Sequence, residues 1–179
     1  VKTTEKILED FLTERPITVR CRTHKASLRE IVTSLKSQGV TVEQAPYLPY
    51  ALKISDYNHI LTLETFLQGK ILVQDVSSML VAEAASPKKG DHIIDMCAAP
   101  GGKSIHAADK MGDYGNVDAR DVSQYKADLI KENIHRTGVI NVEARVQDAT
   151  VYDPDSEQAA DIVIADVPCS GYGVIGKKP

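Results

Sequence analysis

Apolar residues in the second half of the chain follow two alternating patterns. Short apolar runs that are typical of strands occur at residues 92–95, 116–120, 141–146 and 161–166. Between them, apolar residues recur at helical spacing over 102–111 and 123–136. Strands that alternate with helices in this way predict an α/β fold with a parallel, doubly wound sheet.

The first half has a more mixed pattern. Helical spacing, with a proline or glycine stop, is found at residues 1–15, 26–38 and 75–85. Strand-like alternation is found at residues 17–22 and near 40–43, 51–54 and 70–73. We therefore predict three parts, which are a helical linker over 1–15, a small α+β subdomain over 16–65 and a second domain over 66–179.

The run from Asp161 to Asp166 is apolar on both faces, and this favours a place in the middle of a sheet. Only 13 residues follow it. A sheet that ended there would leave an apolar edge. We expect the chain to be a piece of a longer protein, with its second domain incomplete at the C-terminus.

Composition limits the class of protein. The hydrophobic fraction of 42% and the charged fraction of 26% are ordinary for a globular protein, and no apolar run is long enough to cross a bilayer. No secretory signal is recognisable, and three widely spaced cysteines favour a reducing compartment. We expect a cytoplasmic protein with no membrane partner, and we favour a monomer.

Charge is distributed unevenly. Residues 1–90 hold 12 Lys and Arg against 10 Asp and Glu, whereas residues 91–179 hold 9 against 15. A polyanion is therefore expected to contact the first half. Candidate phosphate contacts are Arg20, Arg22, Lys25, Lys177 and Lys178, although each is equally explained as a solvated surface side chain.

The segment from Asp95 to Ser104 follows the first strand of the predicted parallel sheet. Ligands of such sheets bind beyond the carboxyl ends of the strands. Small residues and the two glycines let the backbone approach a ligand, and the next helix offers its amides to an anion such as the carboxylate of an amino-acid-bearing cofactor. The alternative is an ordinary tight turn. The phosphate-loop pattern is not satisfied, because Cys97 stands where its first glycine belongs.

Two aspartates follow the next strands. Asp121 lies 26 residues after Asp95, where an acidic residue accepts hydrogen bonds from ribose hydroxyls, although it also suits the N-cap of the following helix. Asp148 is placed to meet an adenine amino group, and taken alone it is only a loop aspartate.

The fourth strand runs into Asp166-Val-Pro-Cys-Ser-Gly171. Methylation of carbon 5 of a pyrimidine requires a thiolate to add at carbon 6, because the ring carbon is otherwise a poor nucleophile. Cys169 in this turn is a candidate for such chemistry, and the alternative is an inert cysteine. Cys21 and His24 have metal-ligand spacing, but no second pair follows, so we expect no metal.

Together these segments resemble successive motifs of the NOL1/NOP2/Sun family of RNA cytosine-5 methyltransferases, and in particular its bacterial RsmB/Sun type, which acts on 16S rRNA. The resemblance is strong over residues 65–179 and loose over 16–65, and it includes Gln74-Asp-Val-Ser-Ser78 and Gly173–Pro179. It implies a Rossmann-like class I methyltransferase sheet, represented by its first four strands, after a small RNA-binding subdomain. It also implies that residues 1–15 link to an N-terminal helical domain.

The resemblance further implies S-adenosylmethionine as cofactor and rRNA as partner. The implied cofactor contacts are Cys97, Ala98, Ala99, Pro100, Gly101, Gly102, Lys103, Asp121, Asp148 and Asp166. Lys103 and Asp166 are expected to orient the cytosine and the methyl donor.

In this family the attacking thiolate follows the fifth strand, so we expect it beyond Pro179. Cys169 then matches the cysteine that assists product release, whereas in DNA cytosine methyltransferases the equivalent Pro-Cys makes the attack. We expect this chain alone to be inactive. Two rivals stay open, a nucleotide- and RNA-binding module without chemistry, and a methyltransferase for a protein or small molecule.

Overall fold

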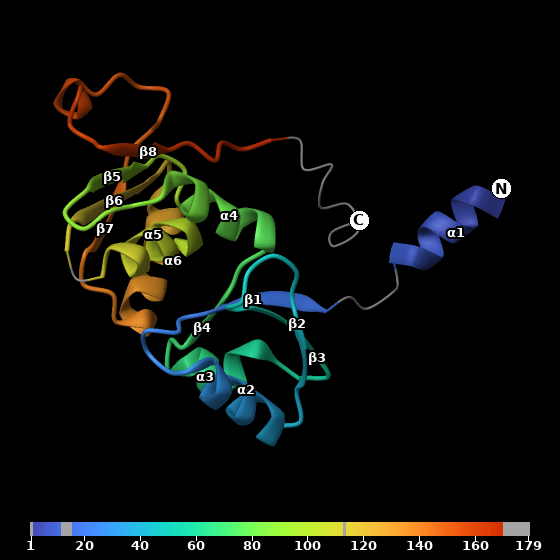
Figure 1. Cartoon of the computed structure of the whole chain (residues 1–179). Helices are drawn as coiled ribbons and strands as arrows, with labels where there is room; N and C mark the ends of the chain where they lie inside the picture. Colours follow the sequence, from blue (N-terminus) through green and yellow to red (C-terminus); the bar gives the residue numbers. More distant parts are fainter. Residues whose placement is uncertain (1, 12–15, 113, 170–179) are drawn as a thin grey trace.

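The computed structural model describes residues 2–11, 16–112 and 114–169, and these residues form two four-stranded sheets (Figure 1). The first sheet contains β1 (Ile17–Cys21), β2 (Thr41–Gln44), β3 (Ala51–Ser55) and β4 (Ile71–Val73). The second contains β5 (His92–Asp95), β6 (Asn116–Asp121), β7 (Val142–Val146) and β8 (Ile162–Ile164). The helices are α1 (Lys2–Phe11), α2 (Leu28–Ser37), α3 (Glu64–Leu67), α4 (Val76–Ala85), α5 (Gly102–Met111) and α6 (Gln124–Thr137), with short 3-10 turns at Ile60–Thr62 and Pro154–Ser156.

The first sheet is antiparallel in the order β2-β3-β1-β4. Helix α2 starts with a capping box in which the side chains of Ser27 and Glu30 accept from each other's backbone amides. Two amides at the start of the helix thereby have hydrogen-bond partners. Its buried Ile31 and Leu35 pack on the apolar face of the sheet, together with Cys21 of β1. Burial raises the pKa of the Cys21 thiol to about 12.

The expected boundary after residue 65 is wrong. Strand β4 pairs antiparallel with β1, with Val19 opposite Val73, so the first unit continues at least to Val73. Helix α3, which spans the predicted boundary, was not predicted either. It has four residues, too few to show helical periodicity.

The second sheet is parallel in the order β7-β6-β5-β8, which confirms the predicted parallel α/β sheet. Buried residues of α5 and α6, among them Ala107, Met111 and Ile130, pack on one face of the strands. Every helix and strand predicted between residues 92 and 166 is present.

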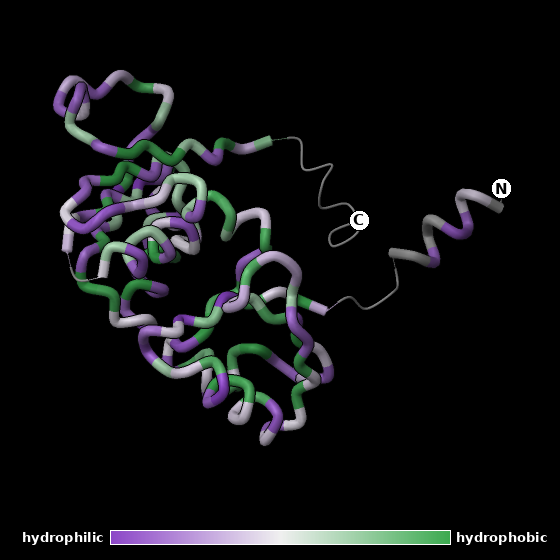
Figure 2. The backbone as a smooth tube through the Cα atoms, in the orientation of Figure 1, coloured by the Kyte–Doolittle hydropathy of each residue, from purple (hydrophilic) through white to green (hydrophobic). Residues whose placement is uncertain are grey.

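Strand β8 lies at the edge of the described sheet rather than in its middle, with β5 as its neighbour. Its hydrophobic sequence stands out in Figure 2, and Val163 on the face away from α5 is 56% exposed. Among the described residues β8 is therefore an apolar edge strand, and a central position in a larger sheet stays a prediction.

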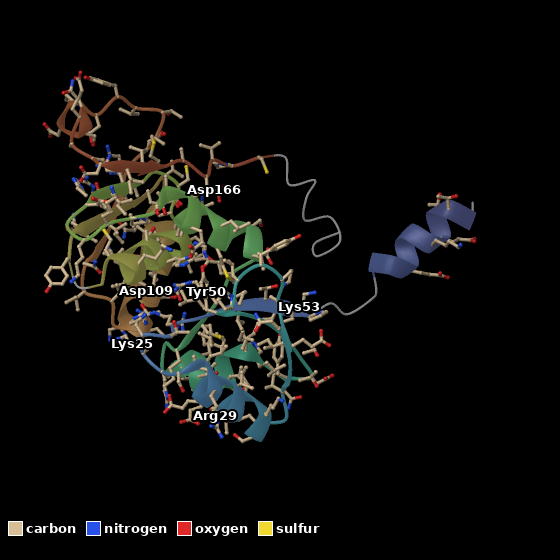
Figure 3. The ribbon with its side chains drawn as sticks, in the orientation of Figure 1. Lys25, Arg29, Tyr50, Lys53, Asp109 and Asp166 are labelled. Atoms are coloured by element: carbon tan, nitrogen blue, oxygen red, sulfur yellow. The ribbon has the colours of Figure 1, made fainter. Side chains whose placement is uncertain are left out.

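Charged side chains join the two units at a junction between β1 and α5. Asp109 of α5 accepts hydrogen bonds from Arg20 Nη1 at 2.7 Å and from Arg22 Nη2 at 2.7 Å. Arg22 also donates to the carbonyl oxygens of Gly69 and Thr137. Burial acts to raise the pKa of Asp109, but the two arginines outweigh it and lower the pKa. Figure 3 shows Asp109 and Tyr50 between the two units.

This junction corrects a prediction. Arg20 and Arg22 are 2% and 1% exposed and donate to groups inside the protein, so neither is a surface phosphate contact. Lys25 is exposed, as a phosphate contact requires. Lys177 and Lys178 lie outside the described residues, as does the motif at 173–179.

Next to the arginines, Tyr50 of the small unit meets the helices of the second unit. Its hydroxyl donates to Glu83 of α4 and lies 3.4 Å from Nε2 of His106 of α5. Burial, followed by the charge of Arg20, lowers the pKa of His106 to about 3. The histidine is therefore neutral at physiological pH.

Candidate cofactor site

The parallel strands bring the predicted site residues to one edge of the sheet. Strands β5, β6, β7 and β8 run in the same direction, so the segments after them begin at the same edge. Asp95 and Asp121 are the last residues of β5 and β6, whereas Gln147-Asp148 and Ala165-Asp166 directly follow β7 and β8. Sequence positions far apart thereby become neighbours.

The loop 97–101 is fastened to β6 by its backbone. The amide of Ala98 donates to the carbonyl of Arg120 at 2.8 Å, and the amide of Ala99 donates to Oδ2 of Asp121 at 3.0 Å. Gly101 has φ of +100°, and a Cβ there would lie 3.3 Å from the Ile130 side chain. Glycine is therefore required at 101 by conformation and by close packing.

Gly102 differs from Gly101. Its φ is not in the left-handed region, and an added Cβ would meet only the Gln74 side chain, at 3.8 Å, which is an ordinary contact. Nothing in the described protein requires glycine here. On its Cβ side Gly102 faces only the Gln74 side chain, and the absence of a side chain of its own suits a loop whose backbone meets a ligand.

Helix α5 begins at this loop without a side-chain cap, because its N-cap residue is Gly101. The first amides of a helix lack carbonyl partners within the helix and carry a partial positive charge. The ten-residue helix therefore offers donors to an anionic group at its N-terminus.

Asp95 is fully buried beneath the loop. One oxygen accepts a hydrogen bond from Ser104 Oγ at 2.7 Å, and the other has no hydrogen-bond partner among the described residues. Burial raises the pKa of Asp95 to about 6, although the Ser104 bond and the charge of Lys103 oppose it. Its carboxyl group thus titrates unusually close to neutral pH.

Asp121 supports the loop rather than capping α6. The N-cap of α6 is Ser123, whose hydroxyl accepts from the amide of Lys126. The carboxylate of Asp121 accepts from the amides of Ala99 and Val122 and pairs with Lys126 Nζ at 3.0 Å. Burial acts to raise its pKa, but these donors outweigh it and lower the pKa. A carboxylate accepts about four hydrogen bonds, so capacity for a ligand donor remains.

Lys103 and Asp166 form an ion pair across the edge, with Nζ and Oδ2 2.5 Å apart. Their side chains are 20% and 57% exposed. The pair connects the start of α5 with the segment after β8, as expected for two residues that act at one site.

Comparison with known proteins identifies the family. The profile of the family described as 16S rRNA methyltransferase RsmB/F matches residues 82–179. This chain belongs to that family. The family predicted from the sequence is thereby confirmed.

Relatives of the RsmB/F family match almost all of the chain. It is 37% identical over 98% of its length to a probable ribosomal RNA small subunit methyltransferase B of Bacillus subtilis, and covers 39% of that protein. It is 33% identical over 97% of its length to a human 28S rRNA (cytosine(4447)-C(5))-methyltransferase, and covers 22% of that protein. The chain thus spans less than half of these relatives.

A solved structure gives the same picture. The crystal structure of a methyltransferase homolog protein from Pyrococcus horikoshii has a TM-score of 0.77 and 30% identity, covering 94% of this chain and 55% of that one. The predicted Rossmann-like methyltransferase fold is therefore confirmed.

The cysteines of this RsmB/F chain differ in environment. Cys169 is exposed and follows β8, and Cys97 is half-buried and follows the neighbouring β5, so both lie at the same edge. Burial, followed by the charges of Asp121 and Asp95, raises the pKa of Cys97, which makes its thiol a weaker nucleophile. All three cysteines lie in described residues, and none forms a disulfide.

Asp148 lies in an exposed turn, where Oδ1 accepts from the amide and hydroxyl of Thr150, and these bonds lower its pKa. It lines a cavity of about 290 Å³ together with Met96 and Tyr152. The adenine contact stays a prediction. In the described part of the chain no group of three His, Cys, Asp or Glu is suited to hold a metal, and no helix there is long and apolar enough to cross a membrane.

Sequence reasoning missed two residues of this edge. Lys126 pairs with Asp121, and the Gln74 side chain lies against Gly102. Gln74 belongs to the motif Gln74-Asp-Val-Ser-Ser78, but its contact with Gly102 depends on how the two units pack. Lys126 lies five residues after Asp121, in the first turns of the predicted helix after β6. That position already indicates that its side chain can reach the Asp121 carboxylate.

Proposed function

We propose that this chain binds S-adenosylmethionine at the carboxyl edge of the parallel sheet and serves an enzyme that methylates carbon 5 of cytosine in rRNA. The observation that carries the proposal is the loop 97–103, which is anchored to β6, carries no side chain at Gly101 and Gly102 and runs into a helix without a side-chain cap. Membership of the RsmB/F family supports the methyl-transfer chemistry.

The donor set fits the cofactor. The α5 N-terminus suits the carboxylate of the methionine part, and Asp121 keeps room to accept from ribose hydroxyls. Asp148 is assigned to the adenine amino group. S-adenosylmethionine carries a positive sulfonium, and the negative charge of Asp95 and Asp166 favours such a cation. When bound, it supplies the methyl group.

The rRNA substrate is proposed from the family and from the names of its relatives, which include small- and large-subunit rRNA methyltransferases. The bacterial relative favours 16S rRNA and therefore the cytoplasm. The small antiparallel unit, with exposed Lys25 and Arg29 (Figure 3), is the proposed RNA-contacting part, and we propose a monomer.

In the proposed reaction a thiolate adds to carbon 6 of cytosine, and the electron pair pushed to carbon 5 accepts the methyl group. Loss of the carbon 5 proton to a base then lets the thiolate leave. We place the attacking thiolate outside residues 1–179 and assign Cys169 to assisting product release. Lys103, held by Asp166 at 2.5 Å, is positioned to orient the base and the methyl donor.

Calorimetry tests the cofactor. The chain should bind S-adenosylmethionine and not NAD, because residues 95–104 lack the Gly-x-Gly-x-x-Gly pattern of dinucleotide-binding loops. Preference for NAD, or for neither, overturns the proposal and favours a different ligand class.

Mass spectrometry tests the substrate. A strain that lacks this protein should lose one 5-methylcytosine from its rRNA, and unchanged rRNA overturns the rRNA assignment. A chain that ends at Pro179 should transfer no methyl group in vitro. If it does, and Cys169→Ser abolishes transfer, Cys169 is the nucleophile instead of the release residue.

A further inference from the structure

Gln74 lies in the link between β4 and α4, where the chain passes from one unit to the other. It is 5% exposed although its side chain is polar. Its backbone amide donates to the carbonyl of Thr18 at 3.1 Å, which keeps the link beside β1. A buried amide side chain is retained only where its polar ends are satisfied.

Both ends of the Gln74 side chain have partners. Oε1 accepts from Arg20 Nε at 2.9 Å, and Nε2 donates to Ser78 Oγ at 3.4 Å. Arg20 is itself fixed, because Nη1 donates to Asp109 at 2.7 Å. Gln74 is therefore held in one orientation by the buried junction.

The same side chain faces the cofactor loop. A Cβ built on Gly102 would lie 3.8 Å from Cδ and 3.9 Å from Cγ of Gln74. Gly102 is the first residue of α5, and Asp109 is near the other end of that helix. Arg20 thus reaches α5 at two places, through Gln74 at its N-terminus and directly at Asp109.

We propose that Gln74 is a positioning residue for the cofactor loop. It sets where Gly101 to Lys103 stand relative to β1, and so it sets the affinity of the loop for S-adenosylmethionine. This inference rests on the proposed function, because it assumes that the loop binds that cofactor. Gln74 acts through Gly102, and no reacting atom needs to touch it.

A consequence is coupling between the two units. Gln74 takes its position from Arg20, a residue of the small sheet, so a shift of β1 moves the support of the loop. Effects of substitutions at Arg20 and Gln74 on cofactor affinity should therefore be non-additive, as is usual for residues in one hydrogen-bond network.

The test measures S-adenosylmethionine affinity by calorimetry on the full chain, at a temperature where each variant is fully folded by circular dichroism. Gln74→Ala should weaken binding about tenfold, because the loop loses its support. Gln74→Glu should restore affinity to within about twofold, since a carboxylate of equal length still accepts from Arg20. Gln68→Ala is the matched control, because the Gln68 side chain is exposed and donates to the exposed Glu64, away from the cofactor loop.

A purely structural role would lower stability without this pattern of loss and rescue. Equal affinity of wild type and Gln74→Ala overturns the positioning role and leaves the proposed function standing. The role is also overturned if Gln74→Glu binds as weakly as Gln74→Ala, or if Arg20→Lys and Gln74→Ala add independently. A wild-type chain that binds no S-adenosylmethionine overturns this inference and the cofactor assignment together.

Discussion

The junction between the units and the carboxyl edge of the parallel sheet are both built from charged side chains, but they use them differently. At the junction, Arg22 and Asp109 are 1% and 7% exposed in their side chains, and they bond each other, Arg20 and backbone carbonyls. At the edge, Lys103 and Asp166 form one ion pair and stay accessible. The junction charges hold structure, and the edge charges are available to a ligand.

The difference follows from desolvation. A buried ion pair has lost its water, so removing one partner leaves an unpaired charge in a medium that cannot solvate it. An exposed pair exchanges its partner for water at small cost. Residue type alone therefore does not distinguish the structural pair Arg22–Asp109 from the accessible pair Lys103–Asp166, and for these two pairs the exposed fraction does.

The largest effect is expected at the junction. Asp109→Asn leaves Arg20 and Arg22 buried without a carboxylate, and we expect it to lower the free energy of unfolding by about 3–5 kcal/mol. Urea unfolding measures it. The control is Asp128→Asn, which removes an exposed pair with Lys131 and should cost under about 1 kcal/mol. Equal losses of unfolding free energy in the two variants would contradict the idea that burial makes the Asp109 ion pairs structural.

The next largest effect is a loss of stability in acid, caused by protonation of His106 at the junction. The pKa of His106 is about 3 in the folded protein against 6.5 ordinarily, so its contribution is complete above pH 6.5 and is lost as the pH falls toward 3. Relative to His106→Gln, wild type should lose about 1.4 kcal/mol per pH unit below pH 6. Unfolding free energies measured from pH 7 to 4 check this, and parallel curves contradict it.

The edge should show the opposite pH trend. The pKa of buried Asp95 is raised from 3.8 to about 6, so it contributes fully below pH 4 and progressively less as the pH rises through 6. Asp95→Asn should therefore gain on wild type between pH 4 and 6, by on the order of 2–3 kcal/mol at the end. A stability difference that does not change with pH would show that Asp95 keeps its ordinary pKa.

The smallest change in stability is expected for Lys103, a proposed cofactor contact. Lys103→Gln breaks an accessible pair, so unfolding should change by under about 1 kcal/mol. Affinity for S-adenosylmethionine should fall about tenfold, because the lysine stands at the loop. Thermal unfolding and calorimetry on one sample separate the two quantities. A large loss of stability with unchanged affinity would place Lys103 with the junction residues.

The sequence predicted the parallel sheet well, because each strand and helix of that sheet carries its own local pattern. It predicted the loop 97–103 and the edge aspartates for the same reason, since strand ends fix where loops emerge. It failed where a position depends on distant partners. β4 has three residues, and only its pairing with β1 assigns it to the first sheet.

The spacing of the two junction arginines in the sequence is itself a sign that they are buried together. Arg20 and Arg22 are two residues apart in the predicted strand over residues 17–22, so they are expected to face the same side, which requires a common anion if that side is buried. Asp109 gave no such signal, because an acidic residue on an amphipathic helix usually faces water. Only the packing of α5 against β1 identifies it as that anion.

Cys21 lies inside the small sheet between these two arginines, so its reaction with a thiol reagent can measure the opening of that sheet. A thiol with a pKa of about 12 and almost no exposed surface reacts with an alkylating reagent only when β1 separates from its neighbours. Cys169, at the other unit's edge, is exposed to the same reagent in the folded state. The rate at which Cys21 becomes labelled therefore reports how often the small sheet opens, and no cysteine needs to be introduced.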